Sequence, residues 1–149
     1  MRFIITSGPD PSQPSKAPAG ADGSFDHELF ARYMKFNEDM HEAGVLVASE
    51  GINPGRGGAR VGVAGGKRTV LDGPFTESKE LIGGFYIVDV ASLDEAISWA
   101  LRCPVGFDAA NLLEIRPLTE LADIPRELRE ISAKVAPAWT ASVTKPRAR

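Results

Sequence analysis

Hydrophobic and polar positions along the chain show two periodicities, one typical of helices and one typical of strands. Together they predict the order of the secondary-structure elements. The clearest helical pattern lies between Ser24 and Gly44, where apolar residues recur every three or four positions opposite a charged face. Its apolar stripe comprises Leu29, Tyr33, Phe36 and Met40. Ser92 followed by Glu95 forms a capping-box pattern that predicts a second helix, which Pro104 ends.

Six short segments carry the β-branched and apolar residues that are typical of strands. They cover residues 2–6, 45–52, 59–64, 67–71, 85–90 and 111–116. The third and fourth segments are expected to form a hairpin, because Gly65-Gly66 permits a two-residue turn with positive φ. Strict alternation along the second segment would place four residues on the same face of the strand: Leu46, Ala48, Glu50 and Ile52.

The resulting order is β-α-β-hairpin-β-α-β, which is the ferredoxin-like arrangement of an α+β domain with an extra hairpin. Two helices can cover only one face of such a sheet. Phe85–Val90 is apolar on both faces apart from Asp89, so the second face also requires burial. A second copy of the sheet is the simplest cover, and the pattern therefore predicts a homodimer.

Composition divides the chain into one domain and an extension. The domain is expected to span residues 1–117, with residues 8–23 as a surface loop rich in Pro, Gly and Ser. Residues 118–149 would form a C-terminal extension, with a helix around Ile131 and a tail from Pro137.

Charge and cysteine content exclude several classes of function. The 149 residues suit one domain, and the net charge of −3 gives no electrostatic case for nucleic acid. Cys103 is the single cysteine, which suits a reducing compartment, and the apolar run Phe3–Ile5 is too short for a signal peptide or a membrane span. We therefore expect a cytoplasmic protein. His27 and His41 lie about 21 Å apart on one helix and cannot share an ion, so no metal or cofactor is expected.

The most unusual segment joins the hairpin to the strongest strand. It reads VLDGPFTESKE at residues 70–80 and is followed by GGFYIVD at residues 83–89. This run resembles the signature of the DGPF-domain proteins, which belong to the YCII-related superfamily. The resemblance covers roughly residues 2–117. It implies a ferredoxin-like domain that pairs as a dimeric α/β barrel, with a polar cleft near the signature. Members are mostly of unassigned activity, and many are encoded beside extracytoplasmic-function sigma factors.

The resemblance also bears on catalysis. Better-studied relatives carry a His–Asp pair in the cleft, and Asp72 could supply the Asp. The place of the His on the first helix is occupied here by Tyr33 or its neighbour Met34, so this chain lacks it. That departure favours a binding or regulatory role over acid–base catalysis.

Five polar residues are candidates for the site, and each has a structural alternative. Asp72 is either a general acid or base or a turn carboxylate that accepts backbone N–H groups. Glu50 is either a ligand-binding carboxylate in an apolar setting or a strand-end residue in solvent. Tyr33 either presents its hydroxyl to a ligand or packs as a core aromatic residue. Glu77 and Lys79 either bind a polar ligand or lie on a solvated loop. The sequence thus predicts a small dimeric protein that binds a small polar molecule or is regulatory, with an acid–base enzyme of hydrolase or isomerase type using Asp72 as the alternative.

Overall fold

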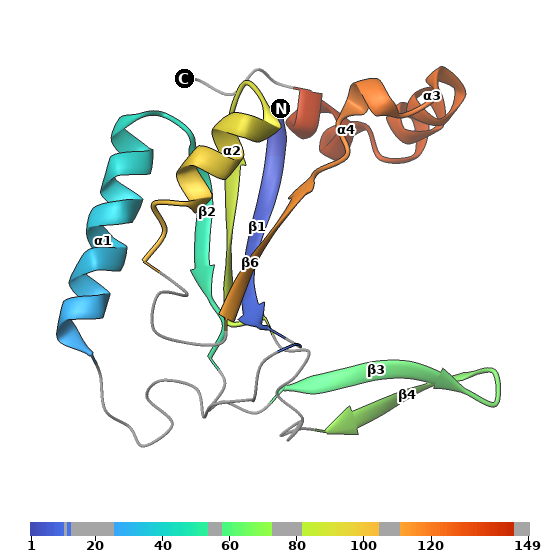
Figure 1. The fold of residues 1–149 in the computed structure, drawn as a ribbon. Helices are drawn as coiled ribbons and strands as arrows, with labels where there is room; N and C mark the ends of the chain where they lie inside the picture. Colours follow the sequence, from blue (N-terminus) through green and yellow to red (C-terminus); the bar gives the residue numbers. More distant parts are fainter. Residues whose placement is uncertain (11, 13–25, 54–57, 73–81, 105–110, 145–149) are drawn as a thin grey trace.

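The computed structural model describes residues 1–10, 12, 26–53, 58–72, 82–104 and 111–144 (Figure 1). Its helices and strands are, in chain order, β1 (Arg2–Pro9), α1 (His27–Glu42), β2 (Leu46–Gly51), β3 (Ala59–Ala64), β4 (Lys67–Asp72), β5 (Gly84–Asp89), α2 (Leu93–Ala100), β6 (Asn111–Pro117), the 3-10 turn η2 (Leu121–Asp123), α3 (Arg126–Val135) and α4 (Pro137–Thr144).

Four strands form one antiparallel sheet in the order β2-β5-β1-β6, and β3 and β4 form a separate two-stranded sheet. Helices α1 and α2 lie on one side of the larger sheet (Figure 1). This order, with one helix between β1 and β2 and another between β5 and β6, is that of a ferredoxin-like α+β fold. The predicted fold class is therefore confirmed.

The hydrophobic core lies between the two helices and the inner face of this sheet. The stripe predicted on α1 faces it, with Phe36 and Met40 buried and Tyr33 half-buried. The buried residues are Phe3, Ile5, Phe36, Met40, Val45, Tyr86, Val88, Val90, Ala96, Ala100 and Cys103.

Local sequence signals set the ends of both helices. The Asp26 carboxylate accepts a hydrogen bond from the Leu29 backbone N–H at 2.8 Å, which satisfies one of the free donors at the start of α1. Gly44 follows α1 with φ of +69°, the left-handed conformation that commonly ends a helix. The Ser92 hydroxyl accepts from the Glu95 N–H at 3.2 Å and caps α2 as predicted.

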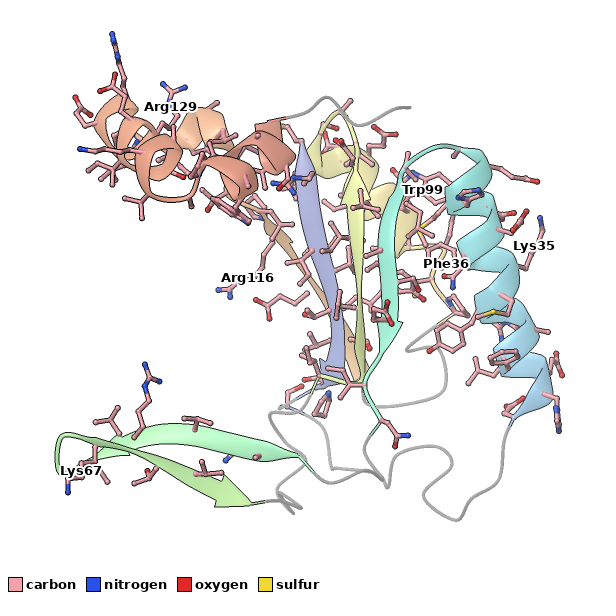
Figure 2. All side chains as sticks on the ribbon, turned by 180° about the vertical axis from the view of Figure 1, so that it is seen from behind. Lys35, Phe36, Lys67, Trp99, Arg116 and Arg129 are labelled. Carbon is pink, nitrogen blue, oxygen red and sulfur yellow. The ribbon has the colours of Figure 1, made fainter. Side chains whose placement is uncertain are left out.

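The outer face of the large sheet is left open by α1 and α2. Neighbouring strands present Ile4, Thr6, Ala48, Phe85 and Ile87 there, all half-buried. Arg116, which pairs with Ile4 in the register, points away from the helices on this side (Figure 2). We call this surface the open face.

The prediction for β2 is wrong in one respect, because a bulge interrupts its alternation. The register shifts between Leu46, opposite Val88, and Ala48, opposite Ile87. One additional residue reverses the direction of every side chain that follows. Leu46 therefore lies on the inner face, whereas Ala48 and Glu50 lie on the open face.

The predicted tail from Pro137 is also wrong, since Pro137–Thr144 forms α4 and contacts α3. Proline suits the first turn of a helix, and Pro137 begins α4 with only Ala136 between it and the end of α3. In the part of the chain that the structure describes, no helix has the length and apolar character needed to cross a membrane.

Candidate functional site

A row of polar side chains lies between α1 and the sheet, where apolar packing would otherwise be expected. Tyr33 and Asn37 come from successive turns of α1, and residues four apart share one helix face. Ser49 and Tyr86 are directly opposite each other on β2 and β5. Cys103 follows the end of α2 and is buried. We call these five residues the polar row.

Hydrogen bonds join most of the polar row into one network. The Ser49 hydroxyl donates to the Asn37 side-chain oxygen at 3.3 Å. The Tyr86 hydroxyl lies within hydrogen-bonding reach of both Ser49 and Cys103. The β2 bulge makes this network possible, because it turns Ser49 toward the inner face.

Both tyrosines of the chain belong to the polar row, and their environment keeps them protonated. Burial raises the pKa of Tyr86 far above its usual value, and the neighbouring Cys103 and Tyr33 raise it further. Burial also raises the pKa of Tyr33, and the neighbouring Cys103 adds to the effect. Two neutral phenols are therefore held close together as hydrogen-bond donors at physiological pH.

Aromatic rings form the apolar border of the polar row. Phe36 meets the Tyr86 ring edge-on, with centroids 5.5 Å apart and planes at 89°. Phe36 also lies 6.3 Å from Trp99 of α2, and Figure 2 shows the two rings between α1 and the sheet. The Arg102 guanidinium stacks on Trp99 at 4.3 Å from its centroid.

Charged groups near the end of α1 pair with one another. The Asp39 carboxylate accepts from Arg102 at 2.8 Å and from Lys35 at 2.6 Å, so it links α1 to the residues after α2. The hydrogen bond from Lys35 is the largest of the effects that hold the pKa of Asp39 below its usual value.

Among the five predicted site residues, the structure describes the side chains of Tyr33 and Glu50 and places them on opposite sides of the sheet. Tyr33 belongs to the polar row. Glu50 is exposed on the opposite side of the sheet, beside Phe85, so the fold does not bring it to Tyr33. Asp72 ends β4 in the separate hairpin, and its side chain lies outside the described residues, as do Glu77 and Lys79. Among the described residues, no group of three or more His, Cys, Asp or Glu side chains could hold a metal ion.

Sequence reasoning missed four members of the polar row. Asn37 could have been found from the sequence, because its amide lies four residues after Tyr33 and interrupts the apolar stripe of α1. Ser49 was hidden by the bulge. Tyr86 was interpreted as an apolar strand residue, and for Cys103 a structural thiol was favoured over a nucleophile.

The family model of the YCII-related domain matches residues 1–122 of this chain. The chain belongs to the YCII-related family. The match confirms the family that the residue 70–89 signature indicated. Residues 123–149, which include α3 and α4, lie beyond the matched region.

Two known proteins are similar to this YCII-related chain, one in sequence and one in structure. A protein of Rhizobium meliloti (strain 1021), described as uncharacterized, is 39% identical over 77 residues, which is 52% of this chain and 62% of that protein's length. A solved structure of 5-chloro-2-hydroxyhydroquinone dehydrochlorinase from Burkholderia phenoliruptrix AC1100 is similar with a TM-score of 0.41 and 17% identity. That similarity covers 84% of this chain and all of the dehydrochlorinase chain.

Proposed function

We propose that this YCII-related protein binds a small uncharged molecule through the polar row. The observation that supports this proposal is the hydrogen-bonded network of Asn37, Ser49, Tyr86 and Cys103, with the Tyr33 phenol beside it. Purely structural packing between a helix and a sheet would use apolar side chains at these positions. A ligand that offers hydroxyl, carbonyl or amide groups could exchange hydrogen bonds with such a row.

The chemistry of the row favours a ligand without charge. Its donors and acceptors are a hydroxyl, an amide, a thiol and two phenols, and both phenols are neutral near pH 7 even at the ordinary tyrosine pKa of 10.0, which burial raises. The nearby charges of Lys35, Asp39 and Arg102 sum to +1, but both cations are already paired with the Asp39 carboxylate. Within the row itself, a charged ligand would lose its hydration without gaining an opposite charge.

Burial indicates which members of the row would contact the ligand first. Tyr33, Asn37 and Ser49 are half-buried, whereas Tyr86 and Cys103 are buried. Tyr33 and Asn37 would therefore bind directly. Tyr86 would hold Ser49 in position and align it with Asn37.

We also propose that the protein is a homodimer that buries its open face. Ile4, Phe85 and Ile87 remain half-buried there, although they lie on the two central strands of the sheet. A second sheet packed on this face would remove them from water. The acid–base alternative that rests on Asp72, and the association with sigma factors, stay predictions.

A thermal-shift screen with a library of uncharged metabolites tests the binding role. We expect compounds that stabilise the wild type and whose effect is reduced by Tyr33→Phe and by Asn37→Ala. Loss of one neutral hydrogen bond should weaken binding by roughly two- to twelvefold, which corresponds to about 0.5–1.5 kcal/mol.

Glu50→Gln is the matched control, because Glu50 was also a candidate from the sequence and lies on the other face of the sheet. It should leave binding unchanged. A compound whose stabilisation survives both row variants but is lost in Glu50→Gln would overturn the proposal.

A further inference from the structure

Two parts of the chain project from the large sheet on the side opposite α1. One is the β3–β4 hairpin, and the other is the α3–α4 pair at the opposite end of the sheet (Figure 1). Arg116 of the open face points into the space between them (Figure 2). We call these two projections the arms. They extend beyond the surface on which a second copy would dock.

The helical arm carries an apolar surface that its own chain does not bury. Leu128, Ile131 and Val135 recur at helical spacing along α3 and are 54%, 57% and 76% exposed. Trp139 and Val143 continue this character on α4, four residues apart. No residue of α3 is buried. An amphipathic helix with its apolar stripe in water is typical of a docking surface.

The hairpin arm shows the same feature. Val61 and Val70 are paired across the two strands and share a face with Val63, and all three are at least 60% exposed. An isolated two-stranded hairpin is marginal in water and requires something to pack against. Both arms therefore carry apolar faces suited to a partner that is positioned between them.

The open face is small, which favours a role for the arms in dimerisation. Four strands of about six residues cover only about 400 Å², given strand spacings of roughly 4.8 Å and a rise of roughly 3.3 Å per residue. A stable interface buries about 800 Å² on each partner. One side of the hairpin and of the two helices would add roughly another 400 Å² of footprint. The arms would therefore about double the area that the chain can offer to a partner.

Charge also favours a second copy of this chain as the partner. The hairpin carries Arg60, Lys67 and Arg68, with Lys67 next to the turn at its tip. Each hairpin strand is about 20 Å long, which equals two layer spacings of about 10 Å and would bring this tip to the partner's helix layer. The exposed side of that layer on α1 carries the acidic Glu28, Glu38 and Glu42 and the basic Arg32 and Lys35, and Lys35 is already paired with Asp39.

We propose that the β3–β4 and α3–α4 arms embrace a second copy of the chain docked on the open face. The inference rests on the homodimer proposed above and adds the residues that hold it together. It gives residues 126–144, which lie beyond the family match, a role in assembly.

Sedimentation equilibrium of the full-length protein over a dilution series tests the arms. Ile131→Lys and Val135→Lys in α3, and Val63→Lys in β3, should each raise the dimer Kd by about tenfold or more, because each places a charge in an apolar contact. Leu101→Lys is the matched control. Leu101 is 73% exposed, close to the 76% of Val135, but lies at the end of α2 on the helix side. Its Kd should change by less than about twofold.

The outcomes separate the two proposals. A wild-type dimer that all three arm variants leave unchanged would overturn the arms and leave the homodimer standing. A wild-type monomer at every concentration would overturn both. A rise in Kd for the arm variants that Leu101→Lys does not share would support the arms.

A second measurement avoids placing a charge in the arms. The chain has two tryptophans, so Trp99→Phe leaves Trp139 of α4 as the single reporter. Its emission should move to longer wavelength when the dimer is diluted below its Kd, because Trp139 then returns to water. Emission that stays constant while the measured mass halves would overturn a role for the helical arm.

Discussion

Replacing Tyr86 by phenylalanine removes a buried hydroxyl from the centre of the polar row and should change how stability depends on pH. The variant loses the single O–H that Tyr86 can donate to Ser49 or Cys103, while Ser49 keeps its bond to Asn37. Near neutral pH the variant should therefore be less stable than the wild type by about 1 kcal/mol, the net contribution of one hydrogen bond.

The difference should vanish in alkali, and the sign follows from the direction of the pKa shift. The ordinary pKa of a tyrosine is 10.0, and burial raises that of folded Tyr86 above it. Below pH 10 the folded and unfolded states both keep the proton, so the contribution is fully present. Above that pH the unfolded state releases the proton first, and the free energy of unfolding falls by up to about 1.4 kcal/mol per pH unit until the folded pKa is reached. The phenyl ring of the variant cannot ionise, so the variant does not share this loss.

Urea unfolding of the wild type and Tyr86→Phe at about pH 8 and about pH 11 measures both effects. We expect a gap of about 1 kcal/mol at the lower pH that closes or reverses at the higher pH. Alkaline difference absorbance gives an independent check, because Tyr33 and Tyr86 are the only tyrosines in the chain. A gap that stays constant with pH, together with tyrosine ionisation at the ordinary pKa, would refute the buried phenol network.

Two further substitutions test the packing that positions the polar row. A Cβ at Gly84 would lie 2.8 Å from the Glu50 carbonyl oxygen, so Gly84→Ala should lower the free energy of unfolding in urea by about 1–3 kcal/mol. At Gly83 the nearest atom to a Cβ would be 3.5 Å away, so Gly83→Ala should leave stability nearly unchanged. Met40 is fully buried against the sheet, so Met40→Ala should lower the free energy of unfolding by about 2–5 kcal/mol. Met34 lies on the exposed side of α1, and Met34→Ala should change it by no more than about 0.5 kcal/mol. Equal losses of stability for the two variants would contradict the observed orientation of α1.

The element order could be predicted from the sequence because each element carries its own local signal. The α1 stripe, the Ser92 cap and the Gly65-Gly66 turn act over a few residues, and the structure shows all three. The two glycines have φ of +58° and +76°, as the two-residue turn requires. These signals, taken in order, were sufficient to give the ferredoxin-like fold.

The polar row could not be predicted because it depends on contacts between distant segments. A single bulge in β2 decides whether Ser49 or Glu50 faces the helices, and strict alternation favoured Glu50. Tyr86 looks like any apolar strand residue until it is set opposite Ser49. Cys103 gains its partner only when α2 packs on the sheet. Tyr33 was found because its helical position is marked by a regular stripe.

The most direct test of the binding role is a map of backbone amide chemical shifts with the strongest compound from the thermal-shift screen. We expect the perturbed amides to cluster at Tyr33, Asn37, Ser49 and Tyr86, and Tyr33→Phe to weaken the same changes. Shifts concentrated on the open face around Glu50 and Phe85, with the polar row unperturbed, would contradict it.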